Sequence, residues 1–189
     1  MITRIARFTS IAGHPAILMP VAAIVATGSG GELKKQLLPA SLAVCCAIIF
    51  VVYSQIKIKS GRWQHVDASV KAERKELNVI ASLALFAGAS ALLLLDVNSS
   101  LVFAMASSGA IFLCCHVFSK LAKPSLHVAF AIFAACLTYP NVIAMVLLFL
   151  MAILLGWSRL HLERHSMLDI AVGAVIGFLA GICFQFLVY

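Results

Sequence analysis

The segment from Ser158 to Asp169 reads SRLHLERHSMLD and concentrates reactive side chains between two apolar stretches. His165 and Asp169 are four positions apart, so they lie on one side of a helix that begins there. Asp169 can accept a hydrogen bond from one imidazole nitrogen, which fixes the tautomer and leaves the other nitrogen able to attack. Arg159 offers a planar pair of donors that suits phosphate oxygens. The segment therefore predicts attack by a histidine on a phosphate group.

A second histidine follows a proline and a serine in the segment 119–127, SKLAKPSLH. Ser125, directly after Pro124, is typical of a helix start. A helix N-terminus presents backbone N–H groups that bind anions. His127, in the first turn of that helix, is then placed to protonate a leaving oxygen. We therefore expect two histidines with different roles at one phosphate site.

The longest polar segment, residues 57–76, supplies cations for the same anion. Three of them lie towards its C-terminal end: Lys71, Arg74 and Lys75. A rival basic set lies at its start: Lys57, Lys59 and Arg62. Between the two sets, His65 and Asp67 are further candidates. Histidines, cysteines and carboxylates nowhere show the spacing of metal ligands, so we expect chemistry without a metal ion or another cofactor.

Membrane spans are the elements that must position these segments. The chain is 63% hydrophobic and 11% charged, with a mean hydropathy of +1.07; a soluble domain is about 45–50% apolar and about 25% charged. In this setting a net charge of +7 orients loops and meets anionic lipid headgroups rather than nucleic acid. We therefore predict one integral, all-α membrane domain over residues 1–189, with membrane lipids as partners.

Apolar runs of about 20 residues suffice for one helical crossing of a hydrocarbon core about 30 Å thick. Such runs cover residues 13–28, 38–56, 77–95, 99–118 and 168–188. We expect the first to be an uncleaved helix rather than a signal peptide. The stretch 128–157 would be about 45 Å long as one helix, and Pro140 next to Asn141 favours a turn. We therefore expect helices at about 126–138 and 141–157, with a re-entrant pair or one kinked helix as alternatives, and six to seven helices in all.

These helices place the three polar segments, 57–76, 119–127 and 158–169, on one face of the membrane together with the N-terminus. All Lys and Arg residues except Lys34 and Lys35 then lie on that face. Cytoplasmic loops carry an excess of Lys and Arg, so the basic face, and the site with it, is predicted to be cytoplasmic. In the last helix, three glycines at four-residue spacing predict close packing against a neighbouring helix: Gly173, Gly177 and Gly181.

The pattern of Ser158-Arg159, five residues, His165, three residues and Asp169 resembles the third signature of the type-2 phosphatidate phosphatase superfamily. The resemblance covers about residues 57–181. It implies a helical membrane bundle that hydrolyses a phosphate ester without a metal ion. It also implies that His165 forms a phosphohistidine, that Asp169 orients this histidine, and that Arg159, with Ser158, binds phosphate oxygens.

The other two signatures are less closely matched. Residues 124–127, Pro-Ser-Leu-His, resemble the second signature, usually Pro-Ser-Gly-His, so Leu126 replaces the glycine. By this resemblance His127 protonates the leaving group and later activates water, while Ser125 and the backbone at Leu126 contact phosphate. The first signature, a lysine, six residues and then Arg-Pro, is missing in that form. The nearest match, Lys71-Ala72-Glu73-Arg74, is similar to a shorter variant in small bacterial members, which implies phosphate binding by Lys71 and Arg74.

The sequence thus favours a membrane phosphatase that acts on a lipid phosphate or an isoprenoid diphosphate, with the lipid tail among the helices and the headgroup in the polar pocket. The alternative is a catalytically inactive relative that binds lipid headgroups or acts as a membrane scaffold. Leu126 and the missing first signature motivate this alternative. A small transporter fits less well, because its polar residues should lie near the middle of the bilayer.

Overall fold

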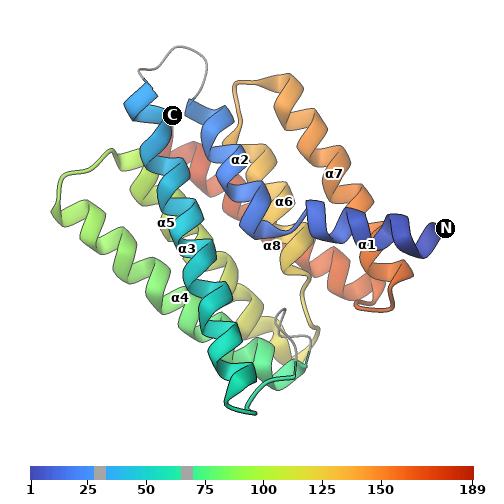
Figure 1. The fold of residues 1–189 in the computed structure, drawn as a ribbon. Helices are drawn as coiled ribbons and strands as arrows, with labels where there is room; N and C mark the ends of the chain where they lie inside the picture. Colours follow the sequence, from blue (N-terminus) through green and yellow to red (C-terminus); the bar gives the residue numbers. More distant parts are fainter. Residues whose placement is uncertain (28–32, 65–69) are drawn as a thin grey trace.

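The structure, a computed structural model, describes residues 1–27, 33–64 and 70–189. These residues form a bundle of helices with no strand among them, which confirms the predicted all-α fold (Figure 1). The helices are α1 Ile2–Ala12, α2 Pro15–Thr27, α3 Leu33–Lys59, α4 Lys71–Leu94, α5 Ser99–Val117, α6 Leu126–Leu137, α7 Val142–His161 and α8 Met167–Val188, with the 3-10 turn η1 at Phe118–Lys120.

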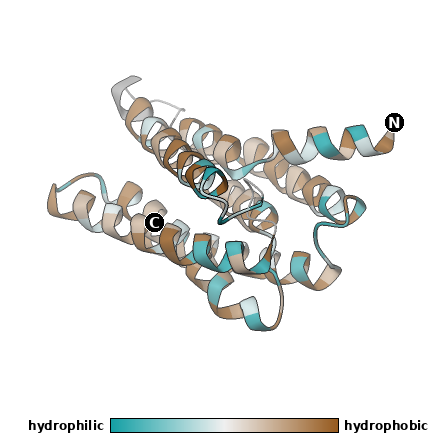
Figure 2. Cartoon of the chain, turned by 60° about the horizontal axis from the view of Figure 1, so that its bottom comes forward, coloured by the Kyte–Doolittle hydropathy of each residue, from teal (hydrophilic) through white to brown (hydrophobic). Residues whose placement is uncertain are grey.

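Five of these helices, namely α3, α4, α5, α7 and α8, are long and apolar enough to cross a membrane. In the described part of the chain the number becomes six if α1 and α2, bent by 53° at their junction, are taken as one span. Large apolar side chains face outwards, as at Ile143 and Ile153 of α7. Figure 2 shows hydrophobic residues along the helices and hydrophilic residues mainly at helix ends and in connections. The chain is therefore an integral, multi-pass membrane protein.

The division of the stretch 128–157 into two helices is confirmed. The short helix α6 ends at Leu137, and α7 begins after Asn141, whose side chain accepts a hydrogen bond from the backbone of Ala144 at 3.1 Å. Asparagine is a favoured N-cap because this bond satisfies one of the free N–H groups of the first turn. At 12 residues, α6 is about 18 Å long and too short to cross the bilayer alone.

The sequence reading missed α1 and placed some helix ends differently. The helix α1 precedes the expected first run, and α3 continues through Lys57 and Lys59, which the sequence assigned to a polar segment. The helix α4 begins at Lys71 rather than near residue 77. Lysine has a helix propensity close to that of leucine, so a span can continue into polar sequence. The end of the predicted run 13–28, at residue 28, and the side chains of Lys34 and Lys35 lie outside the described residues.

The helix α6 occupies the middle of the bundle, packed against α2, α7 and α8. Its alanines and Phe133 are buried almost completely. The three glycines of α8 lie on the face that meets α6: a Cβ at Gly173 would come within 2.7 Å of the Ser125 carbonyl oxygen, and one at Gly177 would collide with the Ala129 backbone. The predicted close packing by these glycines is confirmed. It brings the first turns of α6 and α8 together.

Candidate functional site

The first turn of α8 holds Asp169 in a reciprocal cap. The Ser166 hydroxyl accepts a hydrogen bond from the Asp169 backbone N–H at 3.2 Å, and the Asp169 carboxylate accepts one from the Ser166 N–H at 2.9 Å. The second carboxylate oxygen accepts a hydrogen bond from the backbone N–H of Lys123 at 2.6 Å. The Asp169 carbonyl oxygen accepts another from Ser125 N–H at 3.0 Å. Asp169 therefore joins the segment before α6 to the start of α8.

His165 lies beside this junction, with its ring buried. Its Nδ1 is 3.1 Å from the carbonyl oxygen of Lys123 and 3.6 Å from the Asp169 carboxylate. The shorter distance is a hydrogen bond and the longer one is not, so Nδ1 carries the hydrogen and donates it to Lys123. Nε2 is then the unprotonated nitrogen, and it has no hydrogen-bond partner among the described residues. Asp169 and His165 are thus linked through the Lys123 backbone, whose N–H bonds to Asp169 and whose carbonyl bonds to His165.

The electrostatic surroundings keep this ring neutral. Burial lowers the pKa of His165 well below its usual value of 6.5, and the positive charges of Arg159, Arg74 and Lys123 lower it further. The Asp169 carboxylate acts in the opposite direction but does not reverse the shift. At neutral pH His165 therefore carries a free lone pair on Nε2 among cations, an arrangement that suits attack on a bound anion.

The start of α6 adds two further polar groups. Ser125 is its N-cap residue, but its hydroxyl makes no capping bond. This hydroxyl and Nδ1 of His127 are buried and have no hydrogen-bond partner in the described part of the chain. Buried polar groups normally have a partner, which can be a water or a ligand. The uncapped N-terminus of α6 itself favours an anion. Leu126, by contrast, packs its side chain into the hydrophobic core.

Arg159 and Ser158, at the end of α7, are buried against α1. Nη1 of Arg159 donates a hydrogen bond to the Ser10 hydroxyl at 2.9 Å, and the Ser158 hydroxyl donates one to the Ala6 carbonyl oxygen at 2.6 Å. The charge of Arg159 also acts on His165. Arg159 is therefore held beside the histidine, whereas the Ser158 hydroxyl already bonds to α1. Phosphate binding by either residue stays a prediction.

The two predicted cations of α4 differ in position. Arg74 is buried, and its charge acts on both His165 and His127. Lys71, three residues earlier, is exposed at the helix start. The structure thus brings Arg74 to the two histidines and leaves Lys71 at the surface. One turn after Arg74, the amide of Asn78 is fully buried without a hydrogen-bond partner among the described residues, a polar position that the sequence reading missed.

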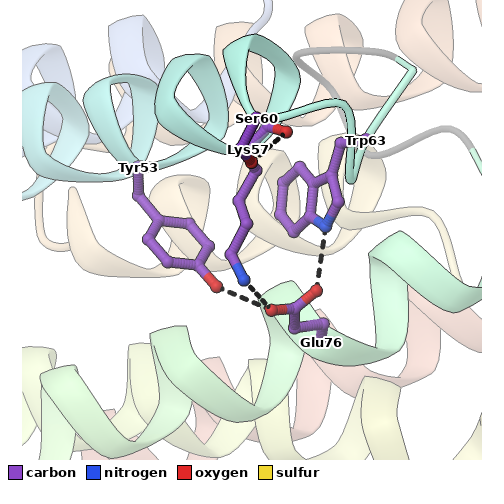
Figure 3. A network of polar contacts seen from close by, with 5 residues as sticks. All are labelled: Tyr53, Lys57, Ser60, Trp63 and Glu76. Carbon is purple, nitrogen blue, oxygen red and sulfur yellow. Dashed lines mark hydrogen bonds and ion pairs between the residues drawn. The ribbon is translucent and has the colours of Figure 1, made fainter.

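Of the rival basic set, Lys57 belongs to a link between α3 and α4 (Figure 3), whereas Lys59 is exposed. Glu76 of α4 accepts hydrogen bonds from the Tyr53 hydroxyl at 3.0 Å, from Lys57 Nζ at 2.5 Å and from the Trp63 indole N–H at 2.9 Å. Lys57 is therefore paired with a carboxylate, and Arg62 is exposed. The link fixes the first turns of α4, which carry Arg74. His65 and Asp67 lie outside the described residues.

The sequence indicates no more than an interfacial or packed position for His14, but the structure places it beside His127. His14 lies in the break between α1 and α2, where its Nδ1 accepts a hydrogen bond from Ala16 N–H at 3.2 Å. Its ring packs edge-to-face against that of His127, with centroids 5.0 Å apart. A histidine at the junction of two short apolar helices gives little signal in sequence, because only the fold brings α2 against α6.

An apolar cavity of about 900 Å³ begins at these side chains and continues into the bundle. His14, Arg74 and His127 line its polar end. Along the rest of its length the lining comes mainly from apolar side chains of α2, α3, α5 and α6. The site therefore combines a cationic, histidine-bearing end with a long hydrophobic extension.

Comparison with known proteins finds no matching protein family, no similar curated protein and no similar solved structure. The resemblance to the phosphatidate phosphatase superfamily therefore rests on the sequence signatures, and the functional argument rests on the geometry above.

Proposed function

We propose that this protein is a membrane phosphatase that hydrolyses a lipid phosphate or an isoprenoid diphosphate through a phosphohistidine at His165. The observation that carries the proposal is the state of this ring. Its Nδ1 is bonded to the Lys123 carbonyl, and its buried Nε2 has no partner among the described residues. Arg159 and Arg74 lie close enough for their charges to act on it. A neutral imidazole facing cations is the arrangement that attack on a phosphate monoanion or dianion requires.

In the first step of the proposed reaction, the Nε2 lone pair attacks phosphorus as the bond to the leaving oxygen breaks. The guanidinium groups of Arg159 and Arg74 stabilise the charge on the equatorial oxygens, with the N-terminus of α6 adding its N–H groups. His127 gives its proton to the leaving oxygen. The negative phosphate in the site favours the protonated form of His127 before this transfer. The lipid alcohol, or the lipid monophosphate when the substrate is a diphosphate, then leaves.

In the second step, His127 accepts a proton from water as the water oxygen attacks the phosphohistidine. The P–N bond breaks, its electrons return to Nε2, and inorganic phosphate leaves. Throughout both steps the Lys123 carbonyl holds the Nδ1 hydrogen, so His165 returns to the same tautomer. Asp169 supports this by fixing the Lys123 peptide. No step uses a metal ion.

The test is phosphate release from a panel of lipid phosphates and isoprenoid diphosphates by purified protein in detergent. His165→Ala should abolish release, with an unchanged melting temperature. His161→Ala is the matched control, because His161 is exposed near the same end of α7, and it should retain wild-type rates. A chelator should have no effect. Full activity of His165→Ala, or loss of activity with EDTA, would contradict the mechanism.

One observation favours the alternative of an inactive, headgroup-binding relative. Leu126 stands where the related signature has glycine, and its side chain is committed to the core. The same panel separates the two functions: tight binding of lipid phosphates without any release by the wild type would establish the binding role.

We also propose that the site faces the cytoplasm. Basic residues surround the site end of the bundle, namely Lys120, Lys123 and Arg164, and cytoplasmic loops carry an excess of Lys and Arg. Asn98 lies at the other end. In a variant without the native cysteines, a membrane-impermeant maleimide applied to intact cells should label Asn98→Cys and not Lys120→Cys. The reverse pattern would place the site outside.

A further inference from the structure

The cavity extends much further than a phosphate group requires. Along α3 its lining runs from Ser54 near the site to Leu38, which is about 24 Å at 1.5 Å per residue. Along α5 it runs from Phe112 to Leu101, about 17 Å. One leaflet of a hydrocarbon core about 30 Å thick is about 15 Å deep. The cavity lining is therefore longer than one leaflet of the hydrocarbon core is deep.

Its chemistry changes with depth. At the site end it is lined by His14, Arg74 and His127, and Arg74 is the one Lys, Arg, Asp or Glu residue among the described lining residues. Deeper, α3 contributes Ala43 and Ala47, small side chains that leave the interior wide. At the far end the lining includes Tyr139 and Tyr189, which are both exposed. Their rings are 6.0 Å apart, and the Tyr189 hydroxyl donates a hydrogen bond to the Tyr139 carbonyl oxygen at 3.3 Å.

The wall formed by α3 is bonded to α4 near the site end. The helix α3 packs along α2, and Tyr53 and Lys57 of α3 both donate hydrogen bonds to Glu76 of α4. Further from the site, Phe50 contacts Phe112 of α5. An apolar chamber whose outer helix, α3, is held by hydrogen bonds near one end suits a ligand that enters between the helices from the lipid rather than from water.

We infer that this chamber holds the hydrocarbon tail of the substrate and selects it by length, with the phosphate at His127 and Arg74 and the tail end beside Tyr139 and Tyr189. This inference rests on the proposed function and deepens it: the substrate is a long-chain phosphate whose tail fills about 20 Å. A tail that is too short leaves part of the chamber unfilled. A longer tail extends past Tyr139 and Tyr189, which are exposed, and gains no further contact with the chamber.

Bulky side chains introduced at two depths along α3 test the inference. Ala47 and Ala43 lie about 10 Å and about 16 Å from Ser54 along the helix, and both line the chamber. Ile48→Phe is the matched control, because Ile48 is exposed on the outer face of the same helix. The assay measures kcat/KM for alkyl phosphates of increasing chain length, in detergent, for Ala47→Phe, Ala43→Phe, Ile48→Phe and the wild type.

In the wild type kcat/KM should rise with chain length until the tail reaches Tyr139 and Tyr189, and longer chains should bring no further gain. Ala47→Phe should move this limiting length to roughly half, and Ala43→Phe to roughly two thirds, as their depths require. Ile48→Phe should leave it unchanged. Identical chain-length profiles in all four proteins would overturn the inference, even if every one of them releases phosphate, and would leave the proposed function intact.

A binding readout keeps the two proposals distinguishable if no phosphate is released. A long-chain alkyl phosphate with a diazirine at the tail end is photolysed on the wild type, and the labelled peptides are identified by mass spectrometry. Label on the peptides that carry Tyr139 or Tyr189 supports the chamber independently of turnover. Label confined to outward-facing residues such as Ile48 contradicts it.

Discussion

Replacing Gly173 by alanine would place a methyl group against the backbone of Ser125. The added Cβ would lie 2.7 Å from the Ser125 carbonyl oxygen and 3.0 Å from its nitrogen, whereas ordinary contacts begin at 3.4 Å. The two helices must therefore move apart by about 0.7 Å at the point where Ser125 N–H bonds to Asp169. Overpacking of this kind costs about 1–3 kcal/mol of stability. A misplacement of about 1 Å can lower a catalytic rate about 100-fold.

We therefore expect Gly173→Ala to fold with a lower melting temperature and to lose about 100-fold in kcat/KM for a lipid phosphate. Gly181→Ala is the matched control on the same face of α8. Its Cβ would meet the Cys136 side chain, at the far end of α6, rather than backbone. This variant should lose stability while keeping kcat/KM within a few-fold of the wild type. A folded Gly173→Ala protein with wild-type kcat/KM would refute the reasoning that α6–α8 packing positions the site.

Three further predictions concern groups around the histidines. His14→Phe keeps an aromatic ring against His127 but removes the imidazole nitrogens. We expect kcat/KM to fall about 10-fold, which corresponds to the loss of one hydrogen bond to a charged group. An unchanged kcat/KM would show that His14 only packs against its neighbours. Arg159→Gln removes a positive charge that lowers the pKa of His165, so this pKa should rise and the acid limb of kcat/KM should move to higher pH; a limb at the wild-type pH would contradict this. Glu76→Gln leaves Lys57 without its charge partner, so the melting temperature should fall, most clearly at low salt; no change in a thermal melt would show that the link does not stabilise the protein.

Much of the fold could be predicted from the sequence, because hydrophobic runs and turn signals are local. The break before Asn141 is predicted by a proline and an N-cap residue. The glycines of α8 predict a close helix contact. The helix α1 was not predicted. It is too short and too polar to read as a span, and its buried side, Ala6 and Ser10, becomes evident only against α7.

The candidate site, like the fold, could be predicted from the sequence only in part. The spacing of His165 and Asp169 predicts that they share a helix face. Their side chains do lie together, 3.6 Å apart, but His165 precedes the N-cap Ser166 and is not part of α8. The hydrogen bond from His165 to the Lys123 carbonyl could not be predicted, since it joins residues 42 positions apart through a backbone atom. His14 was missed for the same reason: its contact with His127 depends on the packing of α2 against α6.

The most direct test of the central claim is to trap the covalent intermediate. His127→Ala should lack the base that activates water, so a phosphate ester with a good leaving group should phosphorylate this variant without rapid turnover. The variant is incubated with radiolabelled substrate, digested and analysed by mass spectrometry. We predict a phosphoryl group on His165 that is labile in acid and stable in alkali. A variant that also carries His165→Ala should contain no label. A phosphoryl group on another residue, or phosphate release without any labelled protein, would contradict a phosphohistidine mechanism at His165.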